Sequence, residues 1–166
     1  MPRADNETRV VPSVFDRLRD DQPEVSTEPA RARARSVAEV KQSVREDLQM
    51  LFNTRQGLPT KPRPGQPELA ADLQNSLLTY GLPDFCSASV VSTPDQNRIR
   101  RALEVAIERF EPRLRDVRVT LLPSRPTERA LHFRIDASLR VEPAPEPVTF
   151  DTVLLISSGE YRIEAR

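Results

Sequence analysis

The stretch TPDQNRIRRALEVAIERFEPRLRDVRVTLL, residues 93–122, decides the fold because it holds a helix, a sharp corner and a strand in succession. Ahead of the corner, apolar residues recur every three or four positions, which places them on one stripe of a helix: Ile99, Leu103, Ala106, Ile107 and Phe110. Thr93 is expected to cap this helix. Pro112 lacks an amide proton and crowds Glu111, so the helix is predicted to end at about Phe110.

A strand is predicted beyond the corner, because Val117, Val119 and Leu121 alternate with their neighbours. Glu111 and Arg113 therefore lie on a stiff corner between a packed helix and a strand. In one interpretation the corner presents a carboxylate and a guanidinium to a partner, and the proline before Arg113 lowers the entropy lost on binding. In the other, the two side chains pair within the chain and satisfy its own helix end. The residues alone favour neither interpretation.

Composition limits the function classes. A chain of 166 residues is long enough for one ordinary core and too short for two. Lys plus Arg and Asp plus Glu are 25 each, so no net positive charge favours nucleic acid as a partner. Cys86 and His132 are the sole residues of their types, which argues against a disulfide, a zinc site or a metal cofactor.

The sequence predicts a cytoplasmic protein with no bound cofactor. Its first residues are interrupted by charges and do not resemble a signal peptide. No run of about 18 apolar residues is present, so direct membrane insertion is not expected. With four glycines, the chain also lacks a Gly-rich strand-to-helix turn for nucleotide binding.

An N-terminal arm is predicted over residues 1–34, ahead of a single domain over 35–166. Phe15 and Leu18 lie on the apolar face of a short helix in this arm, and a Pro-rich, charged linker follows. A helix of two turns is marginal alone and must dock. Docking on its own domain and docking on a neighbouring subunit are equally compatible with the sequence.

Two further helices are predicted before the corner. One covers residues 36–54, with competing capping boxes at Ser36 and Ser43, and Gly57 is expected to adopt a left-handed conformation after its end. Another covers residues 68–80, with one apolar face of Leu69, Leu73, Leu77 and Tyr80. Phe85 is expected to fill the core beneath the turn that follows.

The last third of the chain predicts strands. Residues 130–142 alternate apolar and polar, residues 148–156 do so after a Pro-rich loop, and a turn at 157–160 leads to a short last strand. The fold class is therefore α+β: two to three helices on one face of a small, mostly antiparallel sheet, with an extended N-terminal arm. The last strand is expected to be an edge that accepts another chain's strand unless it is blunted.

Four stretches resemble one family. The run FEPRL at 110–114, followed by DVRV and preceded by IRRALEVAIER, is similar to the TssE family of type VI secretion baseplate wedge subunits, which also includes the wedge protein of contractile-tailed phages. The other three stretches are PSVFDRLRDD, SVREDLQMLFNTR and SLLTYGLPDF. All four occur in the family's order and span nearly the whole chain, which argues against chance similarity.

The resemblance implies a structural subunit without catalytic activity. It implies a wedge with TssF, TssG and TssK around the tube hub, and exposed strands that template the first ring of the sheath proteins TssB and TssC. By position, the family's core motif falls on Glu111, Pro112 and Arg113, and its Asn-Thr-Arg signature falls on Asn53 and Arg55. These residues, with Phe15 and Leu18 of the arm, are the expected partner-binding residues. Glu111→Ala or Arg113→Ala should therefore leave a folded monomer but stop sheath assembly.

Two other functions are alternatives to a structural baseplate subunit. Phage relatives have been called lysozyme-like, and a glycoside hydrolase needs two carboxylates about 5 to 9.5 Å apart in a sugar-sized cleft. The candidates are Glu108, Glu111 and Asp116, but Arg113 favours ionised Glu111, and the chain has no Trp and two Tyr for sugar stacking. Hydrolysis is therefore disfavoured. An adaptor or regulatory interaction domain remains the alternative of a different class.

Overall fold

The computed structural model describes residues 24, 36–57, 73, 76–85, 87–89, 91–123, 130–141, 144–155 and 157–165. The predicted arm helix with Phe15 and Leu18, the start of the predicted helix at 68–80, and Cys86 lie outside the described residues. The predictions made for them are not tested by the structure.

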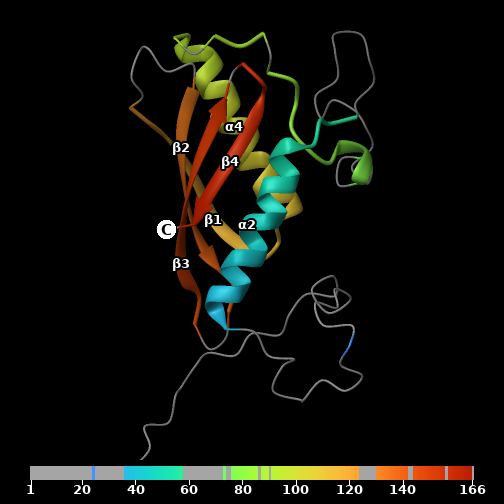
Figure 1. Ribbon diagram of the computed structural model, residues 1–166, viewed down its shortest axis with the longest axis vertical. Coiled ribbons are helices and arrows are strands. Elements are labelled where there is room, and N and C mark those ends of the chain that lie inside the picture. Colours follow the sequence, from blue (N-terminus) through green and yellow to red (C-terminus); the bar gives the residue numbers. More distant parts are fainter. Residues whose placement is uncertain are drawn as a thin grey trace, which may run out of the picture.

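The described elements form the expected α+β fold, with two α-helices and a four-stranded antiparallel sheet in the order β1-β2-β3-β4. Consecutive strands pair, so the sheet is a meander, and Figure 1 shows α2 running alongside β4. The bounds are α2 Val37–Asn53, η2 Leu77–Thr79, α4 Thr93–Phe110, β1 Leu114–Leu122, β2 Ala130–Leu139, β3 Glu146–Leu155 and β4 Glu160–Ala165.

Helix α4 ends where Pro112 predicts and begins at Thr93, so its cap lies one residue earlier than expected. Ser92, not Thr93, is the N-cap, and its side chain accepts a hydrogen bond from the Asp95 amide. Thr93 is already helical. At the other end Glu111 leaves the helical region with φ −120° and ψ 80°, as expected for a residue before proline.

Helix α2 resolves the competition between the two capping boxes. The Ser36 side chain accepts from the Glu39 amide, and Glu39 accepts from the Ser36 amide, so the first box forms. Ser43 is instead buried inside the helix. The expectation for Gly57 is wrong, because the glycines with positive φ among the described residues are Gly81 and Gly159.

The helix predicted over residues 68–80 is not α-helical up to Tyr80. Its final residues form the short 3-10 element η2, and Leu77 is 86% exposed although it was expected on a buried face. Thr79 is buried instead. Tyr80 packs edge-on against Phe110, with ring centroids 5.2 Å apart. The apolar spacing therefore misled because a one-turn element buries different positions from those of a continuous helix.

The core lies between the helices and one face of the sheet. Strand β2 buries Leu131, Phe133, Ile135, Ala137 and Leu139, the alternating residues that the sequence predicts. They join one cluster with the stripes of both helices and with Phe85, the expected core residue. The helices contact opposite edges of the sheet, α4 along β1 and α2 along β4.

Three strands differ in detail from the prediction. Strand β2 ends at Leu139, short of the predicted end at residue 142. Strand β3 begins at Glu146, so Pro147 lies within it, paired in register with Ser138, and does not interrupt the ladder. Strand β1 carries one extra residue between Arg115 and Arg118, and Asp116 there has φ 53°. Such a bulge bends a strand next to a corner.

Candidate functional site

The corner between α4 and β1 is held by backbone hydrogen bonds. The Leu114 amide donates to the Glu111 carbonyl at 3.1 Å and closes a turn around Pro112. The Arg140 amide, just past β2, donates to the Arg113 carbonyl at 2.8 Å. Pro112 is exposed at the tip, whereas Glu111 is buried. The corner is therefore a rigid support for two charged side chains of opposite sign.

The Arg113 guanidinium joins the corner to α2 of the same chain. Its Nε donates to Glu111 Oε1 at 2.7 Å, and its Nη2 donates to Glu111 Oε2 at 2.5 Å. On α2, Ser43 Oγ accepts a hydrogen bond from the Arg113 Nη1 at 3.3 Å, and Asp47 forms an ion pair with Nη2. The corner is thereby tied to the middle of α2 by a guanidinium that binds two carboxylates.

Electrostatics favour the ionised form of this arginine. Burial alone would lower the pKa of Arg113, but the hydrogen bonds and charges of Glu111 and Asp47 outweigh it and raise the pKa. Burial and the same two carboxylates raise the pKa of nearby Tyr80. Among the described residues, the Asp47 and Glu111 carboxylates both bind this one guanidinium.

The pairing that the structure shows is the intramolecular one. The Glu111 side chain is only 5% exposed, and removing its arginine would leave a buried carboxylate without compensation. Breaking such a pair costs about 3–5 kcal/mol. Arg113→Ala is therefore expected to destabilise the domain, which revises the expectation of a well-folded variant. Asp47, whose side chain is 43% exposed, is the network's most accessible charge and was missed by sequence reasoning.

The two other predicted site residues, Asn53 and Arg55, lie at the end of α2, away from the corner. Asn53 lies six residues beyond Asp47, about 9 Å along the helix. Arg55 is 71% exposed and lies 3.5 Å from Asp84. The structure does not bring this pair together with Glu111 and Arg113.

Two motifs that are distant in sequence meet at this end of α2. Thr54 and Gln56 exchange backbone hydrogen bonds of 2.9 Å with Leu82, and Arg55 bridges Leu82 in parallel. Gly81 permits the approach, since its φ is 103° and a Cβ there would strike the Thr54 carbonyl. The Asn-Thr-Arg and Leu-Pro-Asp-Phe runs line one pocket of about 210 Å³. Gly81, the residue directly after the predicted helix at 68–80, is the sequence signal for this contact.

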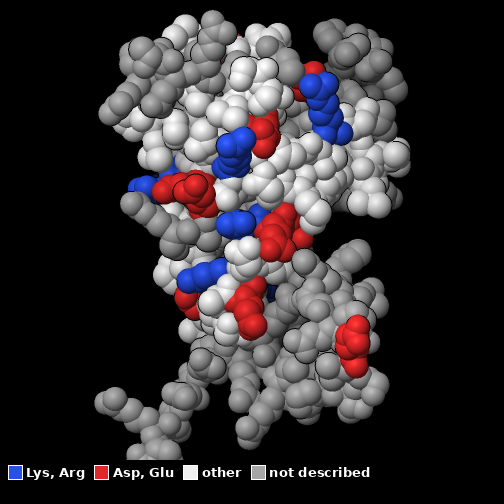
Figure 2. Space-filling model, in the orientation of Figure 1, with Lys and Arg blue, Asp and Glu red and all other residues white. Residues whose placement is uncertain are grey.

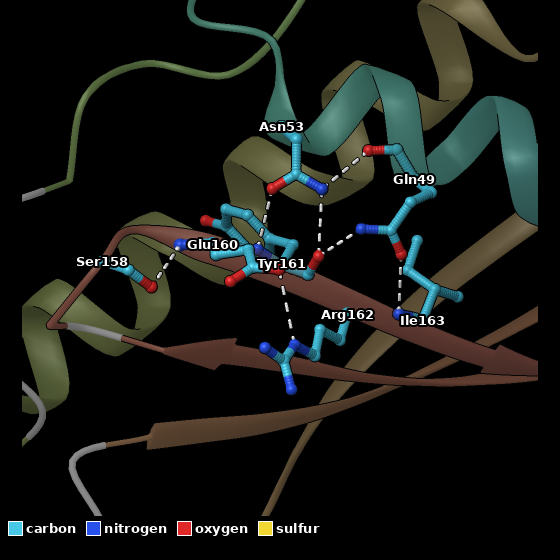
Figure 3. A network of polar contacts seen from close by, with 7 residues as sticks. All are labelled: Gln49, Asn53, Ser158, Glu160, Tyr161, Arg162 and Ile163. Carbon is cyan, nitrogen blue, oxygen red and sulfur yellow. Dashed lines mark hydrogen bonds and ion pairs between the residues drawn. The ribbon is translucent and has the colours of Figure 1, made fainter.

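The β4 edge, expected to be open for strand pairing, is closed by α2. Figure 3 shows Gln49 and Asn53 reaching the backbone of β4. The Tyr161 amide donates to Asn53 Oδ1 at 2.9 Å, and the Ile163 amide donates to Gln49 Oε1 at 2.9 Å. Both side-chain amides donate in turn to the Tyr161 carbonyl. The edge strand is as predicted, but at these residues it is blunted.

The opposite edge, β1, is closed by α4. The Val119 amide donates to Glu104 Oε1 at 3.2 Å, and the Glu104 side chain is 8% exposed. Arg100 and Arg101 bind the same carboxylate at 2.8 and 3.3 Å. Each helix therefore covers one edge strand with polar side chains, an arrangement that the apolar stripes alone did not predict.

The described surface gives little support to catalysis. Glu111 is buried and paired, while Glu108 and Asp116 are exposed, so the three hydrolase candidates have different surroundings.

Within the described ranges, no group of three or more His, Cys, Asp or Glu side chains is placed to hold a metal ion. Charges of both signs alternate across the face in Figure 2. No described helix is long and apolar enough to cross a membrane.

One comparison with known proteins gives a match. The sequence model of a family described as baseplate wedge protein gp25 matches residues 38–144, more than half of the chain. The match covers α2, α4, the corner, β1 and β2. No curated protein matches the sequence.

Proposed function

The chain belongs to the family of the baseplate wedge protein gp25, and from this premise we propose that it is a structural, non-catalytic subunit of a type VI secretion baseplate. The family implies a baseplate role in a contractile injection machine and contacts with other baseplate components. The finer proposal is a wedge with TssF, TssG and TssK beside the tube hub, in the cytoplasm at the inner face of the envelope.

The observation that carries the proposal is a rigid corner whose charges are fixed in place by this chain. Glu111 and Arg113 orient one another, and Asp47 stays accessible on the same network. A preorganised charge loses little entropy when a partner engages it. We therefore assign the partner contact to Asp47, the exposed Pro112 and the accessible part of Arg113, with Glu111 as a positioning residue.

We place a second contact at the end of α2. Arg55 and Asp84 are both more than half exposed beside a pocket of about 210 Å³. An exposed ion pair contributes little stability, so its members are available to a partner at small cost. The arm residues Phe15 and Leu18 complete the proposed partner-binding set.

Contact with the sheath proteins TssB and TssC is proposed to use the sheet edges. The Gln49 and Asn53 amides bond the same β4 backbone groups that an added strand would bond. An incoming strand would therefore exchange with side-chain hydrogen bonds and would not need to enter the core. In this proposal the edge is released on assembly and closed before it.

The test is a pull-down of tagged chain from its native cytoplasm, with partners identified by mass spectrometry. The wild type should retain TssF, TssG and TssK, and Asp47→Arg should reduce them at least about tenfold, the effect of about 1.4 kcal/mol. Glu108→Lys, a charge reversal of the same size at an exposed site on α4, is the matched control.

Two results would contradict the proposal. Wild type that retains no baseplate subunit would favour an adaptor or regulatory domain. Equal retention by Asp47→Arg and the control, with both folded by circular dichroism, would remove the corner network from the interface.

A further inference from the structure

A groove lies between α4 and the segment that leads from η2 to Phe85. Its volume is about 600 Å³. Gly81, Pro83 and Phe85 line one wall, and α4 supplies the other with Arg98, Arg101, Ala102, Val105, Ala106, Arg109 and Phe110. No acidic side chain is among these residues.

The α4 wall borders the stripe that enters the core and shares Ala106 and Phe110 with it. Ala102 and Val105 recur at helical spacing and are only partly buried, whereas Leu103 and Ile107 are fully buried against the sheet. Phe110 and Phe85 add aromatic surface at the groove. The groove floor is therefore apolar and borders the core.

Three arginines surround this floor. Arg98 lies over the Phe85 ring at 5.8 Å from its centroid and 3.4 Å from Asp95, while its side chain stays 57% exposed. Arg101 contacts Glu104 and is 66% exposed. Among the described residues, Arg109 has no ion-pair partner. Arg109 and the exposed part of Arg98 are thus accessible to carboxylates from outside the chain, whereas Arg101 also serves Glu104.

We propose that this groove docks an amphipathic helix with acidic flanks from a neighbouring polypeptide. The α4 wall from Arg98 to Arg109 extends for about 16 Å, which matches about three turns of a docked helix. Apolar anchors would lie on Ala102 and Val105, and flanking carboxylates would pair with the arginines, as in helix-in-groove recognition. Only the identity of the partner as a baseplate subunit rests on the proposed function.

The test uses two synthetic peptides and the full chain. Each peptide has about 16 residues, with leucines at helical i, i+3, i+4 and i+7 spacing, and its flanks carry Glu in one and Lys in the other. Fluorescence anisotropy should show the Glu peptide binding at least about tenfold more tightly. Arg98→Glu with Arg109→Glu should reverse the preference, and Arg101 is kept because it also holds Glu104.

Two further variants separate the groove from general charge. Val105→Asp should weaken the Glu peptide, because it places a like charge on the floor without touching the arginines. Arg115→Glu with Arg118→Glu changes the net charge equally at exposed residues of β1 and should leave the preference intact.

Three outcomes would overturn the proposal. Equal affinity for the two peptides would remove the charge selectivity, and an equal loss in the β1 control would show nonspecific attraction. Concentration-dependent dimerisation that Arg98→Glu with Arg109→Glu abolishes would assign the groove to a second copy. Because this assay contains no baseplate protein, its result is independent of the pull-down.

Discussion

The two edges of the sheet are closed by different chemistry. At β4, the neutral amides of Gln49 and Asn53 donate and accept at once, so each satisfies backbone groups of both kinds. At β1, the Glu104 carboxylate only accepts, and it depends on Arg100 and Arg101 for its charge balance.

This difference in chemistry indicates which edge of the sheet can open to a partner strand. Amides that replace a missing strand imitate the backbone and need no counterion, so their bonds resemble those of an added strand. A buried carboxylate is costly to leave without its arginines. The β4 edge is therefore the one more readily exchanged for a partner strand, and the β1 edge is the more permanent one.

Of the changes to the two edges, the largest effect is expected from opening the β4 edge. Gln49→Ala with Asn53→Ala removes the partners of the Tyr161 and Ile163 amides and should cost about 2–6 kcal/mol, since each of the two unsatisfied groups costs about 1–3 kcal/mol. Urea unfolding measures the loss. Analytical ultracentrifugation should also show self-association through the exposed edge. Unchanged stability and a strict monomer would contradict the closed-edge account.

A somewhat smaller loss is expected at the β1 edge. Glu104→Ala removes a charged acceptor from the Val119 amide and should cost about 1.5–3 kcal/mol. Glu104→Gln keeps an acceptor and should cost less, so the pair separates the hydrogen bond from the charge. If Gln proves as harmful as Ala by urea unfolding, the charge dominates and the hydrogen bond to β1 is incidental.

The sequence predicts the elements on both sides of this contrast, but not the polar contacts that close the two edges. The helix, corner and strand of residues 93–122 were readable because proline and apolar periodicity act locally. The roles of Gln49 and Glu104 do not follow from the apolar spacing, because spacing does not show which strand needs hydrogen-bond partners: the Ile163 amide is 114 residues from Gln49, and the Val119 amide is 15 from Glu104. Likewise, the closeness of Arg113 to Asp47 depends on how α2 packs, which no local pattern encodes.

A smaller effect on stability is expected at Tyr161, which lies on β4. In the described part of the chain its buried hydroxyl has no hydrogen-bond partner, so Tyr161→Phe should change stability at neutral pH by less than about 1 kcal/mol. Burial raises the pKa of Tyr161, so the folded state resists ionisation. Wild-type stability should therefore decline as pH rises above the unfolded pKa of about 10, and the Phe variant should decline less in thermal melts.

The smallest effect is expected at the start of α4. The Ser89 amide, more than any other group, lowers the pKa of Asp95, and Arg98 and Ser92 lower it further. This stability is present above the unfolded pKa of about 4 and is lost as pH falls through the folded pKa. Asp95→Asn should flatten the acid limb of the stability curve measured between about pH 6 and 3. An identical acid limb in both proteins would show that Asp95 contributes nothing.

The bond from Gln49 to Ile163 joins residues 114 positions apart, whereas the four strands pair only with their neighbours in the chain. Contacts of long sequence separation have the larger loop-closure cost, so the hairpins should assemble first and α2 should dock late in folding. Until that docking step, the β4 edge is uncovered. A newly made chain would therefore pass through a brief interval in which a neighbouring strand competes with its own helix.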